Sequence, residues 1–233
     1  MSNEAAPHAA VTGSSGGIGR AIASHLLEQG WRVSGLDLAA PTLSHEGFTH
    51  AAVDLSDAGA IARATPALQH ADALVHAAGV LRVGPLGQLD HAGGELMWRL
   101  HVDAATRLAD ALVPAMAARG RGRVVFIGSR VAQGLPGRGQ YAATKAALIA
   151  LARSWAAEVA ASGVTVNVVS PGATQTAMLL DPARAGSAPR LPPIGRLIEP
   201  AEIAALVAFL LSAPAAAITG QDIAICGGAS LHR

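Results

Sequence analysis

The feature of this sequence that most constrains its fold is a glycine-rich turn between a predicted strand and a predicted helix. The apolar stretch at residues 9–11 runs into Thr12-Gly-Ser-Ser-Gly-Gly-Ile-Gly19, and the residues from there to Gly30 place apolar positions at helical spacing. In this context glycines let the backbone approach a pyrophosphate, which the N-terminus of the helix then holds. The turn therefore predicts an α/β fold that begins with a dinucleotide-binding unit. The predicted contacts are Gly13, Ser15, Gly17, Ile18 and Gly19.

An acidic residue follows the next predicted strand. Residues 31–36 have the pattern of a strand, and Asp37 comes directly after it, eighteen residues past Gly19. A carboxylate at this place accepts hydrogen bonds from the adenosine ribose and repels a 2′-phosphate, so it favours NAD over NADP. The alternative interpretation is a surface acid in a turn, because neighbouring residues also set the cofactor preference.

Strands and helices alternate along the rest of the chain. Further strands are predicted at residues 48–53, 71–76, 123–128, 164–169 and 218–226. Helices are predicted at 56–68 with Ser56 as its cap, at 95–119 with Pro114 as an interruption or kink, at 141–161 and at 200–211. This alternation predicts one Rossmann-type domain over residues 1–233, with a doubly wound parallel sheet of about seven strands and helices on both faces. Residues 173–195, rich in Pro and Gly, predict a lid over the substrate.

Composition excludes several classes of protein. Of the 233 residues 14% are charged, the formal net charge is +1, and no stretch approaches the length of uninterrupted apolar residues that spans a membrane. We therefore expect no membrane association and no nucleic-acid partner. The lone Cys226 forms no internal disulfide and residues 1–10 lack a secretory signal, so we expect a cytoplasmic protein.

The sequence contains one Tyr and one Lys, and they lie four positions apart, at Tyr141 and Lys145. Because the surrounding stretch is Ala-rich and predicted to be helical, one turn places both side chains on the same face. Every other residue among the 17 Lys and Arg is Arg. The retained Lys therefore indicates a role for a compact cation with rotatable donors, which a guanidinium cannot fill. The alternative is an accidental pair on a solvated helix face.

In order along the chain, Thr12-Gly-x-x-x-Gly17-x-Gly19, Ser129, Tyr141-x-x-x-Lys145 and Pro171-Gly172 resemble the motifs of the short-chain dehydrogenase/reductase family. The resemblance covers essentially the full length and implies an NAD-dependent enzyme that acts on alcohols or ketones. Within the family, residues 72–84 and 218–231 are similar to the NAD-dependent 2,3-dihydro-2,3-dihydroxybenzoate dehydrogenases of siderophore synthesis.

The resemblance implies roles for the catalytic residues. Tyr141 would be the general acid/base at the substrate oxygen, and Ser129 would donate a hydrogen bond to the same oxygen. A phenol is ordinarily protonated at neutral pH, so the cation of Lys145 would favour the phenolate, and it would also hold the ribose hydroxyls. For Ser129 the alternative is a polar residue that merely ends a strand.

The resemblance also implies further cofactor contacts, no metal, and a homotetramer built through the helices that start near Glu95 and Tyr141. Around the adenine and its ribose, the implied contacts are Asp54, Leu55, Ala77, Ala78 and Gly79. Around the nicotinamide, they are Tyr141, Lys145, Pro171, Gly172, Thr174 and Thr176, the two threonines holding the carboxamide.

Three positions depart from the family pattern. His76-Ala-Ala-Gly79 stands where the family has Asn-Asn-Ala-Gly, and His101 aligns with the catalytic Asn that is thought to support a water relay to the lysine. An imidazole can relay protons, but His101 is equally well interpreted as a packed helix residue. The gap from Ser129 to Tyr141 is one residue shorter than the commonest spacing, which a loop can absorb.

The sequence thus predicts an oxidoreductase that moves hydride between NAD(H) and a small, cyclic or aromatic-derived secondary alcohol or ketone. Arg130 and Arg138, before Tyr141, raise the hypothesis of an anionic substrate, against the simpler interpretation of solvated loop charges. One alternative is a 3-oxoacyl carrier-protein reductase, although Asp37 disfavours the NADPH expected there. Another is a catalytically weak NAD-binding protein, for which His76 and His101 would be signs of drift.

Overall fold

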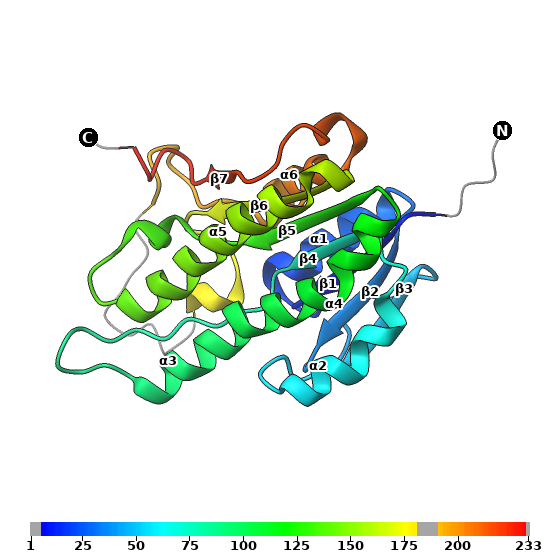
Figure 1. Ribbon diagram of the computed structural model, residues 1–233. Coiled ribbons are helices and arrows are strands. Elements are labelled where there is room, and N and C mark those ends of the chain that lie inside the picture. Colours follow the sequence, from blue (N-terminus) through cyan, green and yellow to red (C-terminus); the bar gives the residue numbers. More distant parts are fainter. Residues whose placement is uncertain (1–5, 181–190, 232–233) are drawn as a thin grey trace.

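The structure, a computed structural model, describes residues 6–180 and 191–231. Its centre is a seven-stranded sheet in which every pair of neighbouring strands is parallel (Figure 1), as predicted. The spatial order is β3-β2-β1-β4-β5-β6-β7. The strands β2 and β3 are therefore added on one side of β1, and β4 to β7 on the other, with the switch between β1 and β4. Ligands bind at the carboxyl ends of strands at such a switch point. The strands are β1 (His8–Thr12), β2 (Arg32–Asp37), β3 (Phe48–Ala52), β4 (Ala73–His76), β5 (Gly122–Ile127), β6 (Val164–Pro171) and β7 (Asp222–Ile225).

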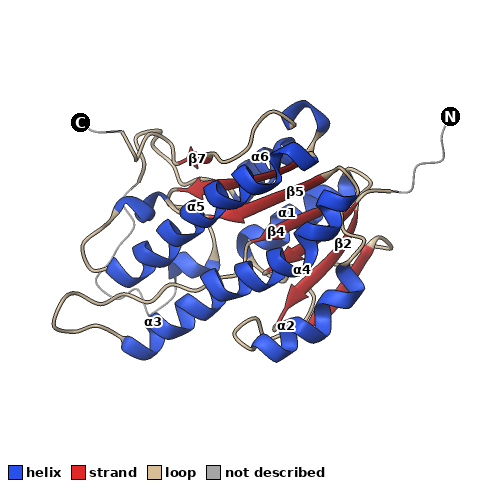
Figure 2. Cartoon of the chain, viewed as in Figure 1, coloured by secondary structure: helices blue, strands red, loops and turns tan. Residues whose placement is uncertain are grey.

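Helices cover both faces of the sheet (Figure 2). One face packs against α1 (Gly17–Glu28) and α6 (Pro200–Leu211), and the other against α2 (Ala58–Ala64), α4 (Ala104–Ala118) and α5 (Gly139–Val159). A further helix, α3 (His91–Trp98), leads into α4. Within the described residues no helix is both long and apolar enough to cross a bilayer.

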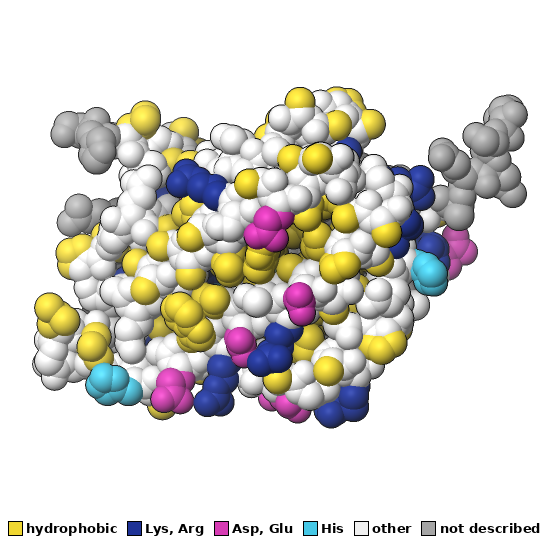
Figure 3. Space-filling model, viewed as in Figure 1, with side chains coloured by type: hydrophobic (Ala, Val, Ile, Leu, Met, Phe, Trp, Pro, Cys, Tyr) yellow, Lys and Arg dark blue, Asp and Glu magenta, His cyan; other side chains and the backbone are white. Residues whose placement is uncertain are grey.

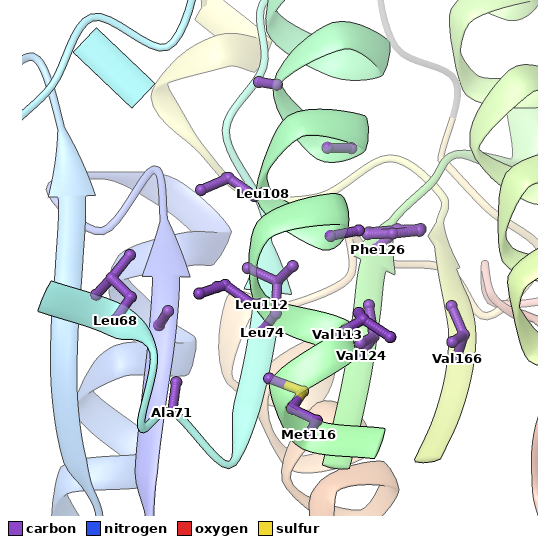
Figure 4. Close-up of a cluster of buried hydrophobic side chains, with 14 of the residues drawn as sticks. Leu68, Ala71, Leu74, Leu108, Leu112, Val113, Met116, Val124, Phe126 and Val166 are labelled. Carbon is purple, nitrogen blue, oxygen red and sulfur yellow. The ribbon is translucent and has the colours of Figure 1, made fainter. Parts of the chain in front are cut away.

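The larger core lies between the sheet and α4. Leu108, Leu112 and Met116 recur every four residues along α4 and are fully buried against β4 and β5 (Figure 4). Their partners on the sheet include Leu74 and Phe126. Burial of each such side chain contributes about 1.5–3 kcal/mol relative to exposure. This packing fixes the ends of β4 and β5, from which part of the site is built.

The start of α2 differs from the prediction. Its N-cap is Asp57, whose Oδ1 accepts a hydrogen bond from the backbone N of Gly59 at 2.8 Å. Ser56 instead donates its hydroxyl to Asp54 at 2.7 Å. Both Ser and Asp are good caps, but Asp57 is the residue with extended backbone next to the first helical turn. The regular helix also ends at Ala64, before a 3-10 turn that contains Pro66.

The long predicted helix starts earlier and is less regular than expected. It begins at His91, because Asp90 accepts a hydrogen bond from the backbone N of Gly93 at 2.8 Å and so caps it. Residues Arg99–Asp103 form a π-helical turn between α3 and α4. The helix then continues through Pro114 to Ala118, so the proline does not end it. The last strand is shorter than predicted, at Asp222–Ile225.

Part of the predicted lid at 173–195 lies outside the described residues, namely 181–190. Of the rest, Ala177–Leu180 forms a 3-10 turn, and Thr174 forms a parallel bridge with Ile198.

Candidate active site

The glycine-rich turn lies against the end of β4. Gly13 has a positive φ of 69°, and a Cβ on it would lie 2.9 Å from Cα of Ala78. A Cβ on Gly19 would overlap the carbonyl oxygen of Gly13. Gly16, the N-cap of α1, brings no side chain to the first turn of the helix, and that turn contains no acidic residue. The turn is therefore a compact cradle of backbone N–H groups, which fits a dinucleotide pyrophosphate.

Thr12 and His76 hold this arrangement together. The hydroxyl oxygen of Thr12 accepts hydrogen bonds from the backbone N of Ala77 and of Ala78, both at 3.0 Å, so its proton is directed to Nδ1 of His76 at 3.0 Å. Nε2 of His76 donates to the carbonyl oxygen of Leu100 at 3.0 Å. Burial, with the nearby charge of Lys145, lowers the pKa of His76 to about 3. The neutral imidazole thus links β1, β4 and the π-helical turn. His76 itself is not among the residues that line the cleft.

Asp37 lies beside the same turn, half-buried. Its Oδ2 accepts a hydrogen bond from the backbone N of Ser15 at 2.9 Å, and its Oδ1 accepts one from the backbone N of Ala39 at 2.9 Å. Ser15 in turn donates its hydroxyl to the carbonyl oxygen of Ala39 at 3.1 Å. Each carboxylate oxygen has a second acceptor position, so the carboxylate is oriented and still able to accept from a ligand hydroxyl.

The two residues after β3 have different environments. Asp54 is exposed and accepts hydrogen bonds from the hydroxyl and backbone N of Ser56, which lower the pKa of its carboxyl group. The side chain of Leu55 is buried in the core beside Leu36, so only its backbone is available to a cofactor.

The predicted catalytic side chains meet in one cleft of about 1030 Å³ at the carboxyl ends of the strands. Ser129 follows β5 and accepts a hydrogen bond from the backbone N of Val131 at 3.2 Å, which leaves its hydroxyl proton for another acceptor. Lys145 lies one helical turn after Tyr141, with Nζ 5.8 Å from the centre of the Tyr141 ring. Both belong to α5, which starts at Gly139.

The ammonium of Lys145 is buried. Its Nζ donates a hydrogen bond to the carbonyl oxygen of Ile127 at 2.8 Å, and the residue is 5% exposed. Burial disfavours the charged form and lowers the pKa of Lys145 to about 7. The site therefore contains a cation that is poorly solvated and favours an anionic neighbour.

His101 lies in the π-helical turn behind Tyr141, fully buried, with the two rings edge to face at 5.6 Å. Its Nε2 accepts a hydrogen bond from the backbone N of Val80 at 3.1 Å, so the proton is on Nδ1 and is donated to Thr144 at 2.8 Å. Thr144 donates its own proton to the carbonyl oxygen of Tyr141 at 2.8 Å. Burial and the Lys145 charge hold the pKa of His101 well below its ordinary value. Both ring nitrogens are engaged by protein atoms, which favours the packed-residue interpretation over the relay.

The structure divides the predicted site residues into two groups. The residues that line the cleft are Ile18, Ala77, Gly79, His101, Ser129, Tyr141, Lys145, Pro171, Gly172, Thr174 and Thr176. The residues outside this lining are Gly13, Ser15, Gly17, Gly19, Asp37, Asp54, Leu55 and Ala78. Thr176 connects the groups, since a Cβ on Gly17 would lie 3.5 Å from its methyl carbon.

Sequence reasoning missed much of the cleft wall. Apolar residues line it from the loops after β4 and β5 and from the described flanks of the lid, and the chain reaches it again after β7. The residues that were not predicted are Val80, Leu81, Ile127, Gly128, Val131, Leu135, Pro136, Gly228, Ala229 and Leu231, whereas Met178, Leu179, Leu191 and Pro193 belong to the predicted lid. The pair Gly227-Gly228, both with positive φ, marks the turn into the cleft and was the available signal.

The charges that line the cleft are positive. Arg130 and Arg138 lie on its wall together with Lys145, and no acidic side chain belongs to the lining formed by residues 6–180 and 191–231. The cleft is thus an apolar chamber with cationic groups near Tyr141.

A dinucleotide cradle that adjoins a cleft with a serine and a Tyr-Lys pair defines the class of nicotinamide-dependent oxidoreductases. Comparisons with known proteins agree. A family profile described as "Enoyl-(Acyl carrier protein) reductase" matches residues 13–230. The chain is 36% identical to the 3-oxoacyl-(acyl-carrier-protein) reductase of Vibrio cholerae, over 94% of this chain and 96% of the relative. It is also 36% identical to the 2,3-dihydro-2,3-dihydroxybenzoate dehydrogenase of Escherichia coli K12, over 95% and 96%.

A solved structure described as a "short chain dehydrogenase/reductase family protein" superposes with a TM-score of 0.90 at 34% identity, and covers 97% of this chain and 98% of its own. The chain belongs to the short-chain dehydrogenase/reductase family, whose members are oxidoreductases that use nicotinamide cofactors.

Proposed function

We propose that the protein transfers hydride between NAD(H) and a small secondary alcohol or ketone, with Tyr141 as the general acid/base. The observation that carries this proposal is the convergence of Ser129, Tyr141 and Lys145 on one cleft that adjoins the glycine-rich turn. When bound, the nicotinamide would accept hydride from the alcohol carbon or supply it to the ketone.

The chain's own residues would handle the oxygen of the substrate. Ser129 would donate its hydroxyl proton in a hydrogen bond to that oxygen. Tyr141 would take the proton of the alcohol or return one to the ketone oxygen. Because the Lys145 ammonium is buried one turn away, a phenolate would be favoured beside it, and the phenolate would in turn keep the lysine protonated. The ammonium would also hold the nicotinamide ribose.

Asp37 supports NAD as the cofactor. Its carboxylate is already oriented beside the turn by Ser15 and Ala39, and it would repel a 2′-phosphate there. Asp54 and the backbone of Leu55 would border the adenine, and Thr174 and Thr176 the carboxamide. The lid at 173–195 would close over the substrate.

The cleft supports a small cyclic or aromatic-derived substrate with an anionic group. Its walls are largely apolar, and Arg130 and Arg138 lie within it without an acidic residue in the described lining. An Arg fork matches the two oxygens of a carboxylate. The second candidate, reduction of 3-oxoacyl carrier-protein thioesters, is favoured by relatives of that activity at the same level of identity.

The test is a panel of substrates assayed with NAD and NADP by the absorbance of the reduced cofactor. Cyclohexanol and 3-hydroxycyclohexanecarboxylate form a neutral and a charged pair, and an acetoacetyl thioester tests the second candidate. We expect NAD-dependent oxidation with a preference for the carboxylate, which Arg138→Gln reduces at least tenfold while the exposed Arg63→Gln does not. Equal turnover of both alcohols, unchanged in Arg138→Gln, would contradict the anion. NADPH-dependent reduction of the thioester alone would favour the second candidate, and cofactor binding without any turnover would indicate a weak cofactor-binding protein.

We also propose that four copies assemble through α5 and the long helix that α3 and α4 form together, and that the protein acts in the cytoplasm. Hydrophobic side chains gather on the face over these helices (Figure 3), and Trp98, at the end of α3, is 50% exposed. The solvent-facing side of α5 carries Ala143, Ala146 and Ala150, which are small enough for close helix packing. The lone Cys226 supports a reducing compartment.

A further inference from the structure

A second cavity lies at the opposite end of the sheet from the cleft. It has a volume of about 670 Å³ and is lined by residues at the starts of β2 and β5, by those before β1 and β4, and by the end of α6. None of the described residues lines both this cavity and the cleft at Tyr141. Its basic residues are Arg32, His70, Arg119, Arg121 and Arg123. Arg side chains also gather near this edge of the molecule, on the right of Figure 3.

Among the described residues, few acidic groups compensate the positive charges of this cavity. Among the described residues that line it, Asp72 is the single acidic one. Its Oδ1 lies 3.5 Å from Nε of Arg121, and its Oδ2 accepts a hydrogen bond from the backbone N of His8 at 3.0 Å. Within residues 6–180 and 191–231, no carboxylate lies at ion-pair distance from the other three arginines. A chain with a net charge of +1 thus concentrates arginine around one hollow.

Three of these arginines donate hydrogen bonds to backbone oxygens, the longest from Nε of Arg32 to the carbonyl oxygen of Ala6 at 3.5 Å. Arg119 donates to the carbonyl oxygens of Gln69 at 3.0 Å and Ala71 at 2.6 Å. Arg123 donates to that of Gly122 at 2.8 Å, while its buried Nε has no hydrogen-bond partner in the described part of the chain. Burial lowers the pKa of the Arg123 guanidinium, as expected for a partly desolvated cation. Carbonyl groups orient these cations without neutralising them, so the cavity is organised in advance for an anion.

We propose that this cavity binds a small phosphorylated ligand carrying two or more negative charges. Guanidinium groups match phosphate oxygens with paired hydrogen bonds, and several of them converge here. Trp31, Pro7 and Leu211 provide an apolar wall for the organic part of the ligand. The volume is in the range of small-molecule sites.

Pyrophosphate is the probe for this site, titrated calorimetrically at constant ionic strength into protein saturated with NAD. The NAD occupies the dinucleotide cradle, so that heat from the probe reports a different site. We expect one site, and at least tenfold weaker binding in the double variant Arg32→Gln/Arg121→Gln. Neither side chain is buried, so the fold should survive, which an unchanged melting temperature verifies. The matched control Arg63→Gln/Arg107→Gln removes the same charge from exposed ion pairs elsewhere and should bind as the wild type does.

A variant that should tighten pyrophosphate binding gives a second test. Asp72→Asn removes the single acidic group of the described lining while keeping an acceptor for the backbone N of His8, so it should tighten pyrophosphate binding severalfold. The proposal is overturned by absence of binding to the NAD-saturated protein. It is equally overturned by binding that neither Arg32→Gln/Arg121→Gln nor Asp72→Asn changes.

Discussion

At the residue scale, three basic side chains lie buried near the reacting groups: His76, His101 and Lys145. Burial lowers the pKa of each, to about 3 in His76, to about 7 in Lys145 and well below the ordinary value in His101. The two imidazoles are neutral and hydrogen-bonded at both nitrogens, whereas Lys145 donates to one carbonyl oxygen among the described residues, that of Ile127. Lys145 is therefore the group whose charge responds most to what occupies the cleft.

The lowered pKa of Lys145 predicts how stability depends on pH in the cofactor-free protein. Between about pH 7 and 10.5 the unfolded chain keeps the lysine proton and the folded chain loses it, so stability rises with pH, by at most about 1.4 kcal/mol per pH unit. Lys145→Met has no such proton to lose. In urea unfolding at pH 7, 8 and 9, the free energy of unfolding of the wild type should rise with pH relative to that of the variant. If the two free energies change in parallel, the lysine is not desolvated.

His101→Asn separates a packing role from proton relay. A shorter amide cannot reach both Val80 and Thr144, so at least one buried hydrogen bond is lost, at a cost of about 1–3 kcal/mol in urea unfolding. If the imidazole only holds these groups, the apparent pKa values of the rate profile stay the same. A shifted profile would instead establish the relay. His91→Asn, an exposed change of the same kind, should alter stability by less than about 0.5 kcal/mol.

These residue contacts also mark the limit of sequence reasoning. Tyr141 and Lys145 could be placed on one face because four positions make one helical turn. The partners of His76 and His101 come from segments 21 to 64 positions away, such as Val80 for His101 and Thr12 for His76, through hydrogen bonds that no local pattern encodes. Likewise the chain after β7 returns to the cleft, and its signal in the sequence is a single pair of glycines, Gly227-Gly228.

At the element scale, the site depends on how closely the glycine-rich turn packs on α1 and β4. Strands and their order along the chain were predictable, because buried strands are short apolar runs that end at polar or glycine residues. The starts of α2 and α3 were not, since two candidate caps adjoin at Ser56 and Asp57, and Gly93-Gly94 weakens the helical pattern that Asp90 begins.

Substitution by Ala at two glycines of the turn should change the melting temperature by different amounts. In Gly19→Ala the new methyl would overlap the carbonyl oxygen of Gly13, so the turn must open, and we expect the melting temperature to fall by about 5–10 °C. Gly16→Ala meets nothing within 4 Å and has extended backbone, so its melting temperature should change by less than about 2 °C. Thermal unfolding of the cofactor-free variants measures both. Equal stabilities would mean that the turn is not closely packed.

At the scale of the whole molecule, the two ends of the parallel sheet differ in the side chains that they present. The carboxyl ends of the strands form the catalytic cleft, and the opposite end forms the arginine-lined cavity. We propose that the outer faces of α4 and α5 contact other copies of the chain. Assembly was inferred from family resemblance, since no residue pattern in a single chain states a number of subunits.

The proposed tetramer predicts a particle of four times the chain mass of 23.4 kDa in analytical ultracentrifugation. Trp98→Glu places a charge on the proposed contact face and should yield smaller species. Leu86→Glu, at a loop position that is 92% exposed, should leave the assembly intact. A monomeric wild type, or a Trp98→Glu protein that keeps the wild-type mass, would refute the proposed interface.

The most direct test of the central claim is the rate of NADH formation by wild type and Tyr141→Phe with the best alcohol of the panel. Phe keeps the ring that lies edge to face with His101 and removes only the phenolic oxygen, so folding and NAD binding should be retained. If Tyr141 is the general acid/base, the rate falls by about 100-fold or more. A Tyr141→Phe protein that binds NAD and forms NADH at the wild-type rate would contradict the account.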